Sequence, residues 1–433
     1  MPMAFKKNRF LSSANIFKDG WRGFSQNFDN EPFGVLSLGS ETIRLAIFRR
    51  DKNNAPLLMG IGMATSLGIK NGFITDLKAC RSRVFLALSQ AEKMAEYNLK
   101  KIALLFSGTK PVVVMKKYNL TLGGAAITRR HLFGLHQRFW SPKIVGDYHL
   151  LYPIPFEYRL DQSPSIKNPL GLVGQNLSLT MAMIYEDRHA LENVDSFLDN
   201  MKLPPSLLMD EAMAVALGMT SVEEQDTGAL SIHIGADTTN VAVIKNFCPI
   251  FLYRFNVGGR SLTRELAKTL RLDIKTAEAV KRNLPDMTGY HASIPPNPLL
   301  PNIDNDKAMV VVRAHLSKFI NHIVGILEKN RIQYQNLSVL AISGGGAKLR
   351  GLDRLLAEKL HKRVHTTPAT NLANLPRYVH GTEIAGLTGV ALFIIKKQLN
   401  QQQQNTSHMD FYQFLPKPSL WRNIIAWAKK NYG

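Results

Sequence analysis

Two nine-residue stretches decide the fold: GSETIRLAI at residues 39–47 and GADTTNVAV at residues 235–243. Both begin with glycine, a small residue, an acid and threonine, and both end with an aliphatic residue, alanine and a β-branched residue. Each stretch follows one apolar strand and leads into another. After it come a proline-containing turn (Pro56 or Pro249), a further strand and a helix. Because the order of elements repeats as well as the text, the chain is predicted to contain an internal duplication.

The repeated turns have the properties of phosphate-binding loops. A glycine-containing turn between two strands exposes backbone N–H groups with little side-chain bulk, which suits phosphate oxygens. A third loop, GGGAKLRGL, follows the strand NLSVLAIS and precedes a helix, whose N-terminus favours negative charge. The text GGRSLTRELA opens the helix after the second repeat. We therefore predict a nucleotide site formed by Gly39, Ser40, Thr42, Gly235, Ala236, Thr238, Thr239, Gly258, Gly259, Gly344, Gly345 and Gly346.

Composition narrows the class of protein. The 433 residues include 54 Lys and Arg against 33 Asp and Glu, a formal net charge of +21, and 45% are hydrophobic. Such a chain can form packed cores. Two cysteines exclude a disulfide framework and fit a reducing compartment. The sequence has no continuous run of about 18 or more apolar residues, so no membrane-spanning helix is predicted. The charge favours either nucleic acid or an anionic membrane surface as a partner.

The end of the chain predicts a helix that lies on a membrane. After the polar stretch QLNQQQQNTSH comes SLWRNIIAWAKKNYG, in which Ser419 can cap a helix. About a dozen residues cannot span a bilayer, but they can lie in its interface. A helix that docks on the protein's own core is the alternative. An anchor with so few basic residues is weak and reversible, so attachment requires several copies and predicts self-association. The predicted membrane-binding residues are Leu420, Trp421, Arg422, Ile424, Ile425, Trp427, Lys429 and Lys430.

Several segments together resemble a known superfamily. The phosphate loops, SLGIKNGFITDLKA, ISGGGAKLRGL and HGTEIAGLTGVALF are similar to the actin and Hsp70 ATPase superfamily. The segment HLLYPIPFEYRLDQSPSIKNPLGLVGQNL resembles, within it, the FtsA family of bacterial cell-division proteins. The resemblance implies an α/β fold of duplicated actin-like (ribonuclease H-like) domains with an inserted FtsA-type subdomain and a C-terminal amphipathic helix.

The resemblance also divides the chain into segments. The expected segments are a basic tail (1–32), a first actin-like domain in two parts (33–97 and 181–228) around an inserted subdomain (98–180), a second actin-like domain (229–396) with a partner-binding subdomain (265–330), a linker (397–415) and the membrane-targeting helix (416–433).

The phosphate loops depart from the family pattern at the positions that hold metal. Ser37, His233 and Asn240 stand where the family has acids, and Asp237 stands where it has glycine. Mg²⁺ requires oxygen ligands, and phosphoryl transfer depends on the metal. Asp237 and Glu41 could be displaced metal ligands, or they could be acids that repel phosphate or face solvent. We expect weak binding of ATP and Mg²⁺ at most, no catalytic residues and no useful hydrolysis.

The function implied by the resemblance is that of a cell-division adaptor. Such a protein tethers the ring protein FtsZ to the cytoplasmic face of the inner membrane at mid-cell. The implied partners are the FtsZ C-terminal tail, other copies of the chain, further division proteins at the inserted subdomain and inner-membrane lipids.

Three other functions remain open at this point. An actin-like ATPase or sugar kinase has the same fold, and so does PilM, a pilus-assembly relative. A nucleic-acid-binding protein would explain the acid-free stretch 97–146, but that stretch carries no recognisable motif, so no nucleic acid is expected as a partner. His361 and His365 have the spacing of zinc ligands on a helix, but no further ligand joins them, so they are predicted to be surface histidines. His233 is predicted to be a hydrogen-bonded core histidine.

Overall fold

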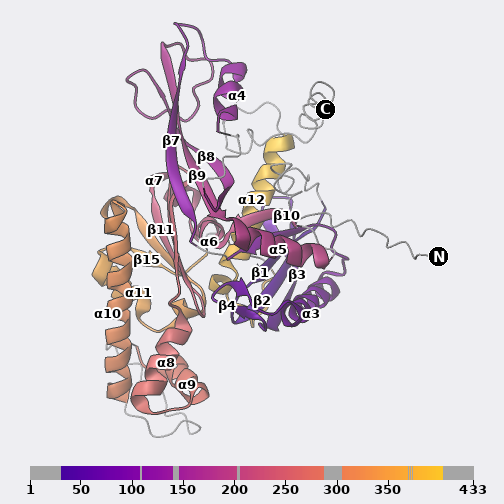
Figure 1. Cartoon of the computed structure of the whole chain (residues 1–433), viewed down its shortest axis with the longest axis vertical. Helices are drawn as coiled ribbons and strands as arrows, with labels where there is room; N and C mark the ends of the chain where they lie inside the picture. Colours follow the sequence, from indigo (N-terminus) through magenta and orange to yellow (C-terminus); the bar gives the residue numbers. More distant parts are fainter. Residues whose placement is uncertain are drawn as a thin grey trace, which may run out of the picture.

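The computed structural model describes residues 31–402, apart from 108–109, 140–145, 202–204, 287–304, 369, 371 and 373. Two five-stranded sheets with their helices form two lobes, and a three-stranded sheet extends from them (Figure 1). The predicted tail (1–32) and membrane-targeting helix (416–433) lie outside the described residues, except for residues 31 and 32.

The sheet of the first lobe has the strand order β10-β6-β1-β2-β3. Its first three strands in the chain form an antiparallel meander, and β6 and β10 then add in parallel beside β1. The five strands are β1 (Phe33–Leu38), β2 (Thr42–Arg50), β3 (Pro56–Thr65), β6 (Ile102–Phe106) and β10 (Pro205–Asp210).

The sheet of the second lobe repeats this plan. Its order is β15-β14-β11-β12-β13, with the same antiparallel meander and the same two parallel additions. The predicted duplication is therefore confirmed. The strands are β11 (Ala229–Ile234), β12 (Thr239–Lys245), β13 (Cys248–Phe255), β14 (Val339–Ser343) and β15 (Val364–His365).

Helices cover both sheets because the central strands are apolar on both faces. In the first lobe, the β4 (Ile69–Lys70) and β5 (Phe73–Ile74) hairpin precedes α3 (Leu77–Ala95), and Asp76 caps this helix. The first lobe and its boundaries also contain α5 (Arg188–Asn200), α6 (Glu211–Met219), α7 (Val222–Thr227) and α12 (Ala385–Gln402). The second lobe contains α8 (Gly259–Leu270), α9 (Ile274–Asn283), α10 (Asn305–Lys329) and α11 (Leu352–Leu360), with short 3₁₀ turns η1 (Tyr334–Asn336), η2 (Gly345–Lys348) and η3 (Gly381–Glu383).

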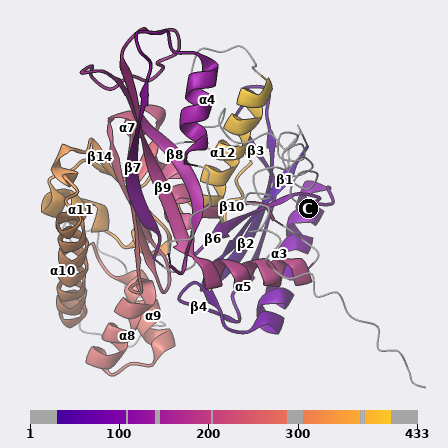
Figure 2. The ribbon, with the colours of Figure 1, turned by 45° about the horizontal axis from the view of Figure 1, so that its top comes forward.

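The two lobes join where α6 crosses α12. Val215, Met219 and Ala385 of these helices form a small apolar cluster with Ala341 of β14. Figure 2 shows α12 beside the first lobe, with α10 and α11 on the far side of the second. The helix crossing thus links the second sheet to the first.

The inserted subdomain is a separate sheet with its own core. Its strands β7 (Val112–Thr121), β9 (Asn176–Asp187) and β8 (Tyr148–Leu160) pair in that order, and α4 (Arg129–Gln137) packs nearby. Leu132, Leu135 and Phe139 bury their side chains against the sheet. Figure 1 shows this unit projecting away from α8 and α9.

The structure places three boundaries differently from the sequence prediction. The insertion begins after β6 and not at residue 98, because β6 pairs with β1 in the first sheet. The third strand of the insertion continues past residue 180 to Asp187. The helix α12 extends to Gln402, beyond the expected start of the linker at 397, because Lys397 and Gln398 are buried.

The helix α10 is the element to consider for a membrane span. Among the described residues, Asp306–Lys329 alone is long and apolar enough to cross a bilayer, with a mean hydropathy of 1.3. One face of this helix, including Val312, Phe319 and Ile323, packs in the core of the second lobe. A core helix passes the same test of length and hydropathy.

Candidate nucleotide-binding cleft

A cavity of about 1310 Å³ lies between the two lobes. Eleven of the twelve residues predicted to bind nucleotide line it. Thr239 is the exception: it is fully buried at the start of β12, where its hydroxyl donates to the Val257 carbonyl at 2.6 Å. Eight Lys and Arg against five Asp and Glu line the cavity, a balance that favours an anionic ligand.

The two repeated turns have the same geometry. A β-carbon on Gly39 would lie 2.6 Å from the Thr42 carbonyl oxygen, and one on Gly235 would lie 3.0 Å from the Thr238 carbonyl oxygen. The N–H of Gly235 also donates to that Thr238 carbonyl at 2.9 Å. The tight return of the chain therefore excludes a β-carbon at Gly39 and crowds one at Gly235, and it brings the loop backbone to the cavity wall.

The third loop belongs to the second lobe and lines the same cavity as the two turns. Gly344 ends β14 with φ of +85°, a conformation that other residues rarely adopt. Gly345 has open space around the position of a β-carbon, with no atom within 4 Å. The loop thus leaves room for a ligand against its backbone.

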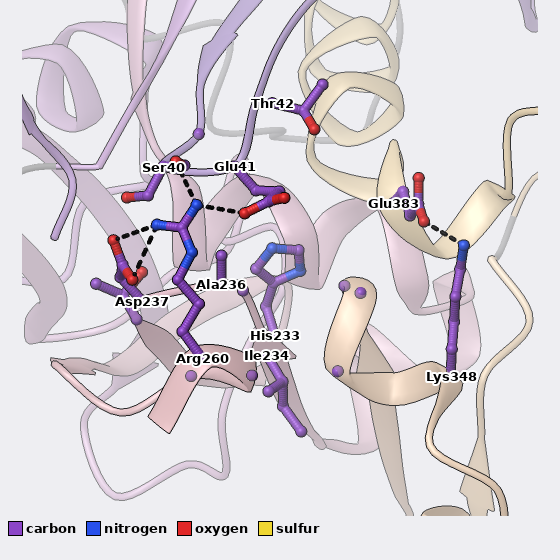
Figure 3. A pocket seen from close by; sticks show the side chains of 18 of the residues that line it. Ser40, Glu41, Thr42, His233, Ile234, Ala236, Asp237, Arg260, Lys348 and Glu383 are labelled. Carbon is purple, nitrogen blue, oxygen red and sulfur yellow. Dashed lines mark hydrogen bonds and ion pairs between the residues drawn. The ribbon is translucent and has the colours of Figure 1, made fainter. Parts of the chain in front are cut away.

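Arg260, at the start of α8, crosses the cleft between the two repeated turns. Its Nη1 lies 3.2 Å from both carboxylate oxygens of Asp237, and its Nη2 donates to the Ser40 carbonyl at 3.3 Å and to the Glu41 carboxylate. Figure 3 shows the guanidinium between Asp237 on one side and Ser40 and Glu41 on the other. One side chain of the second lobe thereby joins both phosphate loops.

Glu383 forms a second bridge across the cleft. One of its carboxylate oxygens accepts from Arg44 of β2 at 3.2 Å, and the other pairs with Lys348 of η2. Burial would raise the pKa of Glu383, but the hydrogen bond from Lys348 and the charge of Arg44 outweigh it and lower that pKa. The carboxylate therefore stays ionised and holds the first sheet to the third loop.

The residues present do not fit a magnesium site. Ser37 and His233 occupy the strand positions where acids were expected, and among the described residues no group of three or more His, Cys, Asp and Glu is arranged to hold a metal. Neither Glu41 nor Asp237 is free, because Arg260 binds both. The interpretation of these acids as solvent-facing is wrong for Asp237, whose side chain is only 4% exposed.

The two histidine predictions have different outcomes. His233 Nδ1 lies 2.9 Å from the Ser343 hydroxyl, so the predicted hydrogen bond is confirmed, although the side chain is half-buried at the cavity wall. Burial is the main cause that lowers its pKa, and the ring is neutral at pH 7. His361 ends α11 and His365 lies on β15, where it pairs with Glu224 at 3.6 Å. The two do not share a helix.

Asn240 belongs to a buried polar network beneath the cleft. Its side-chain oxygen accepts from Arg254 Nε at 2.5 Å, and its amide donates to Glu211 at 2.8 Å. Arg254 also pairs with Asp210 at 3.1 Å, and both side chains are at most 2% exposed. Asn240 therefore connects Arg254 to Glu211 and supplies no carboxylate for a metal.

Glu211 is an acid at the cavity that the sequence patterns did not single out. It begins α6, accepts from the Ser107 hydroxyl at 2.7 Å and lines the cavity. Burial would raise its pKa, but the charge of Arg254 and the hydrogen bonds from Ser107 and Asn240 outweigh it and lower that pKa. Its one sequence signal is its place directly after the apolar strand β10. Arg44, Arg260 and Glu383 lie within segments that the sequence analysis singled out, but no role was predicted for these three side chains.

Comparison with known proteins agrees with this architecture. The family model described as Cell division protein FtsA matches residues 230–382, and the model described as SHS2 domain inserted in FTSA matches residues 109–185. Cell division protein FtsA of Rhizobium meliloti is 24% identical over 389 residues, which cover 87% of each chain. The FtsA of Escherichia coli K12 is 21% identical over 367 residues, 80% of this chain and 86% of that protein.

Solved structures share the fold at low sequence identity. A PilM–PilN type IV pilus biogenesis complex matches with a TM-score of 0.57 and 19% identity, over 84% of this chain and 99% of that one. MreB 5 of Spiroplasma citri bound to AMPPNP matches with a TM-score of 0.51 and 17% identity, over 86% and 99%. Together with the two family models, these likenesses show that the chain is an FtsA-like protein: an actin-like ATPase fold of two duplicated lobes with an inserted SHS2 domain.

Proposed function

We propose that this chain is a cell-division adaptor that tethers the FtsZ ring to the cytoplasmic face of the inner membrane. The observation that carries the proposal is the SHS2 domain inserted in an actin-like body, since curated relatives over most of the chain are cell division proteins FtsA. The amphipathic helix at 416–433 would supply the attachment, and the weak anchor requires self-association.

The proposed partner regions come from the resemblance to the FtsA family. The subdomain 265–330, which contains α9 and α10, would bind the C-terminal tail of FtsZ. The inserted sheet projects from the body, so it can contact a neighbouring copy or later division proteins without closing the cleft. The lipids of the inner membrane would meet the terminal helix.

The cleft would bind a nucleotide without useful hydrolysis. Its glycine turns and its excess of basic side chains suit phosphates. Ser37, His233 and Asn240 supply no carboxylate for a metal, and phosphoryl transfer depends on metal and positioning together. Nucleotide would therefore act as a structural ligand.

Liposome sedimentation tests the tethering function. The full chain and a chain without residues 416–433 are mixed with anionic liposomes and spun. We expect the full chain to pellet and the shortened chain to stay in the supernatant, and the double variant Trp421→Ala/Trp427→Ala to be impaired as well. Equal sedimentation of the full and shortened chains would exclude tethering by this helix. In cells, a fluorescent copy should form a mid-cell band that both changes abolish.

A metal-dependent ATPase is the second candidate, because Glu211 presents an ionised carboxylate to the cavity. Measurement of phosphate release with and without Mg²⁺ separates the two candidates. Mg²⁺-dependent turnover that Glu211→Ala abolishes would support the ATPase, whereas a rate no higher than that of ATP alone supports the adaptor.

A further inference from the structure

Arg260 lies between the two repeated turns, and a cation at this place would be beside the phosphates of a nucleotide that both turns bind. In a nucleotide cleft, a metal ion has two tasks: it neutralises the phosphates, and it links them to the loops on either side. Arg260 already links these loops, since its guanidinium contacts Ser40 and Glu41 in one turn and Asp237 in the other. The contact spans 220 positions of the sequence between Ser40 and Arg260.

Asp237, the acid of the second turn, is saturated by nitrogen donors. Both oxygens of Asp237 accept from Arg260, and one of them also lies 3.4 Å from the N–H of Asn71. Arg264, one turn along α8, approaches the other oxygen at 3.8 Å. Mg²⁺ takes near-ideal octahedral oxygen ligands, so it would have to displace the guanidinium from a carboxylate that is almost completely buried.

A guanidinium can perform the neutralising task itself. It stays charged at all relevant pH values, and its planar set of N–H donors matches phosphate as well as carboxylate. The side chain of Arg260 is 40% exposed on the cavity side, so it remains accessible to a ligand while it is held. The second bridge, Arg44–Glu383–Lys348, holds the lobes together elsewhere in the cleft, so the loops do not depend on a metal for their spacing.

We propose that the cleft binds the phosphates of a nucleoside di- or triphosphate without a divalent metal ion, with Arg260 as the built-in cation. This inference rests on the proposed nucleotide binding and adds its metal independence. Removal of Arg260 would leave Asp237 and Glu41 unneutralised beside the phosphates. In that variant the two carboxylates would repel the ligand unless Mg²⁺ replaced the lost charge.

Isothermal titration of the full chain with sodium ATP tests the proposal, once in EDTA and once in excess MgCl₂. For the natural chain, we expect the two dissociation constants to agree within about threefold. For Arg260→Ala, we expect binding in EDTA to weaken by about tenfold or more and Mg²⁺ to restore part of it. Lys268→Ala is the matched control, because this exposed residue of α8 carries the same charge but does not line the cavity.

The outcomes separate this inference from the one on which it rests. If the natural chain binds ATP in MgCl₂ but not in EDTA, metal independence is wrong, although the chain still has a nucleotide site. No binding of ATP in either buffer overturns both. Arg260→Ala that binds in EDTA as tightly as the natural chain overturns the role of Arg260. The melting temperature of Arg260→Ala is measured to show that this variant is folded. Arg260→Lys, which keeps the charge but loses the planar set of N–H donors, is titrated as well.

Discussion

Gly389 of α12 lies so close to Ala214 of α6 that a β-carbon on Gly389 would be 1.8 Å from the Ala214 carbonyl oxygen. The contact is reciprocal, because a β-carbon on Gly218 would lie 2.0 Å from the Ala385 carbonyl oxygen. Each helix thus presents an alanine and a glycine four residues apart to the other. At this crossing the two helix backbones are in direct contact. No flexible side chain lies between them that could move to make room for an added methyl group.

Gly389→Ala is therefore expected to destabilise the protein by about 3 kcal/mol or more, because the new methyl group meets backbone atoms. Thermal and urea unfolding measure the change. Gly325→Ala is the matched control: Gly325 lies within α10 with no atom within 4 Å of an added β-carbon. Alanine is the better helix former, so this control should gain about 0.5–1 kcal/mol. Equal stabilities for the two variants would contradict the close packing of α6 and α12.

The sequence contained enough information for the duplicated sheets but not for the bridges between them. The repeat at residues 39–47 and 235–243 predicts a strand, a tight turn and a second strand, and this pattern is local. The contact of Arg260 with Glu41 joins residues 219 positions apart. No spacing rule predicts such a pair, because its formation depends on how the lobes pack.

The same reasoning explains the residues that the patterns misplaced. Thr239 follows the second turn directly and looked like part of the phosphate loop, but it begins β12 and faces the interior. Residue 98 looked like the start of the insertion, yet the next strand returns to the first sheet. Strand pairing depends on tertiary packing, and the sequence of one short apolar strand does not determine its neighbours in the sheet.

The buried pair of Arg254 and Asp210 predicts a large loss of stability when one partner is removed. Asp210 accepts from Arg254 with one oxygen and from the N–H of Met213, at the start of α6, with the other. Burial, and then the charge of Asp210, raises the pKa of the neighbouring Glu186, whereas the charge of Arg254 lowers it. Arg254→Met should cost about 3–5 kcal/mol in urea unfolding, because it leaves a buried carboxylate unneutralised.

Arg159→Met serves as the control for this prediction. Arg159 pairs with Glu157 at 3.0 Å, but its side chain is 51% exposed. An ion pair in solvent contributes less than about 1 kcal/mol, so the control should unfold at nearly the same urea concentration as the natural chain. Losses of equal size in the two variants would contradict the structural role of the buried pair.

His136 predicts an acid-sensitive stability in the inserted domain. Its Nε2 bonds to the hydroxyl of Tyr158 in the core of that domain, and burial lowers its pKa from 6.5 to about 3. Between these two values the unfolded chain binds more protons than the folded one, so stability falls as pH falls. Above pH 6.5 both states are neutral at this ring, and no cost arises.

His136→Phe should remove this component. The free energy of unfolding of the natural chain is expected to fall, relative to that of the variant, by up to about 1.4 kcal/mol per pH unit below pH 6.5. Urea unfolding at several pH values between 7.5 and 4.5 measures the difference. His189→Phe, which removes a mostly exposed histidine, should follow the natural chain. A difference between the natural chain and His136→Phe that does not change with pH would contradict the prediction.

The proposed site for the FtsZ tail predicts that Val310 matters for binding. Val310 is 68% exposed on α10, within the subdomain 265–330, and Val222 on α7 is 66% exposed outside it. The two residues have the same chemistry and exposure, so Val310→Asp and Val222→Asp form a matched pair. Fluorescence anisotropy with a peptide of the FtsZ C-terminal tail should show binding weakened about tenfold by Val310→Asp, because an exposed apolar side chain in an interface carries binding energy. Val222→Asp should leave the affinity within about twofold. Equal affinities for the two variants would place the tail site elsewhere, and no binding by the natural chain would contradict the adaptor function itself.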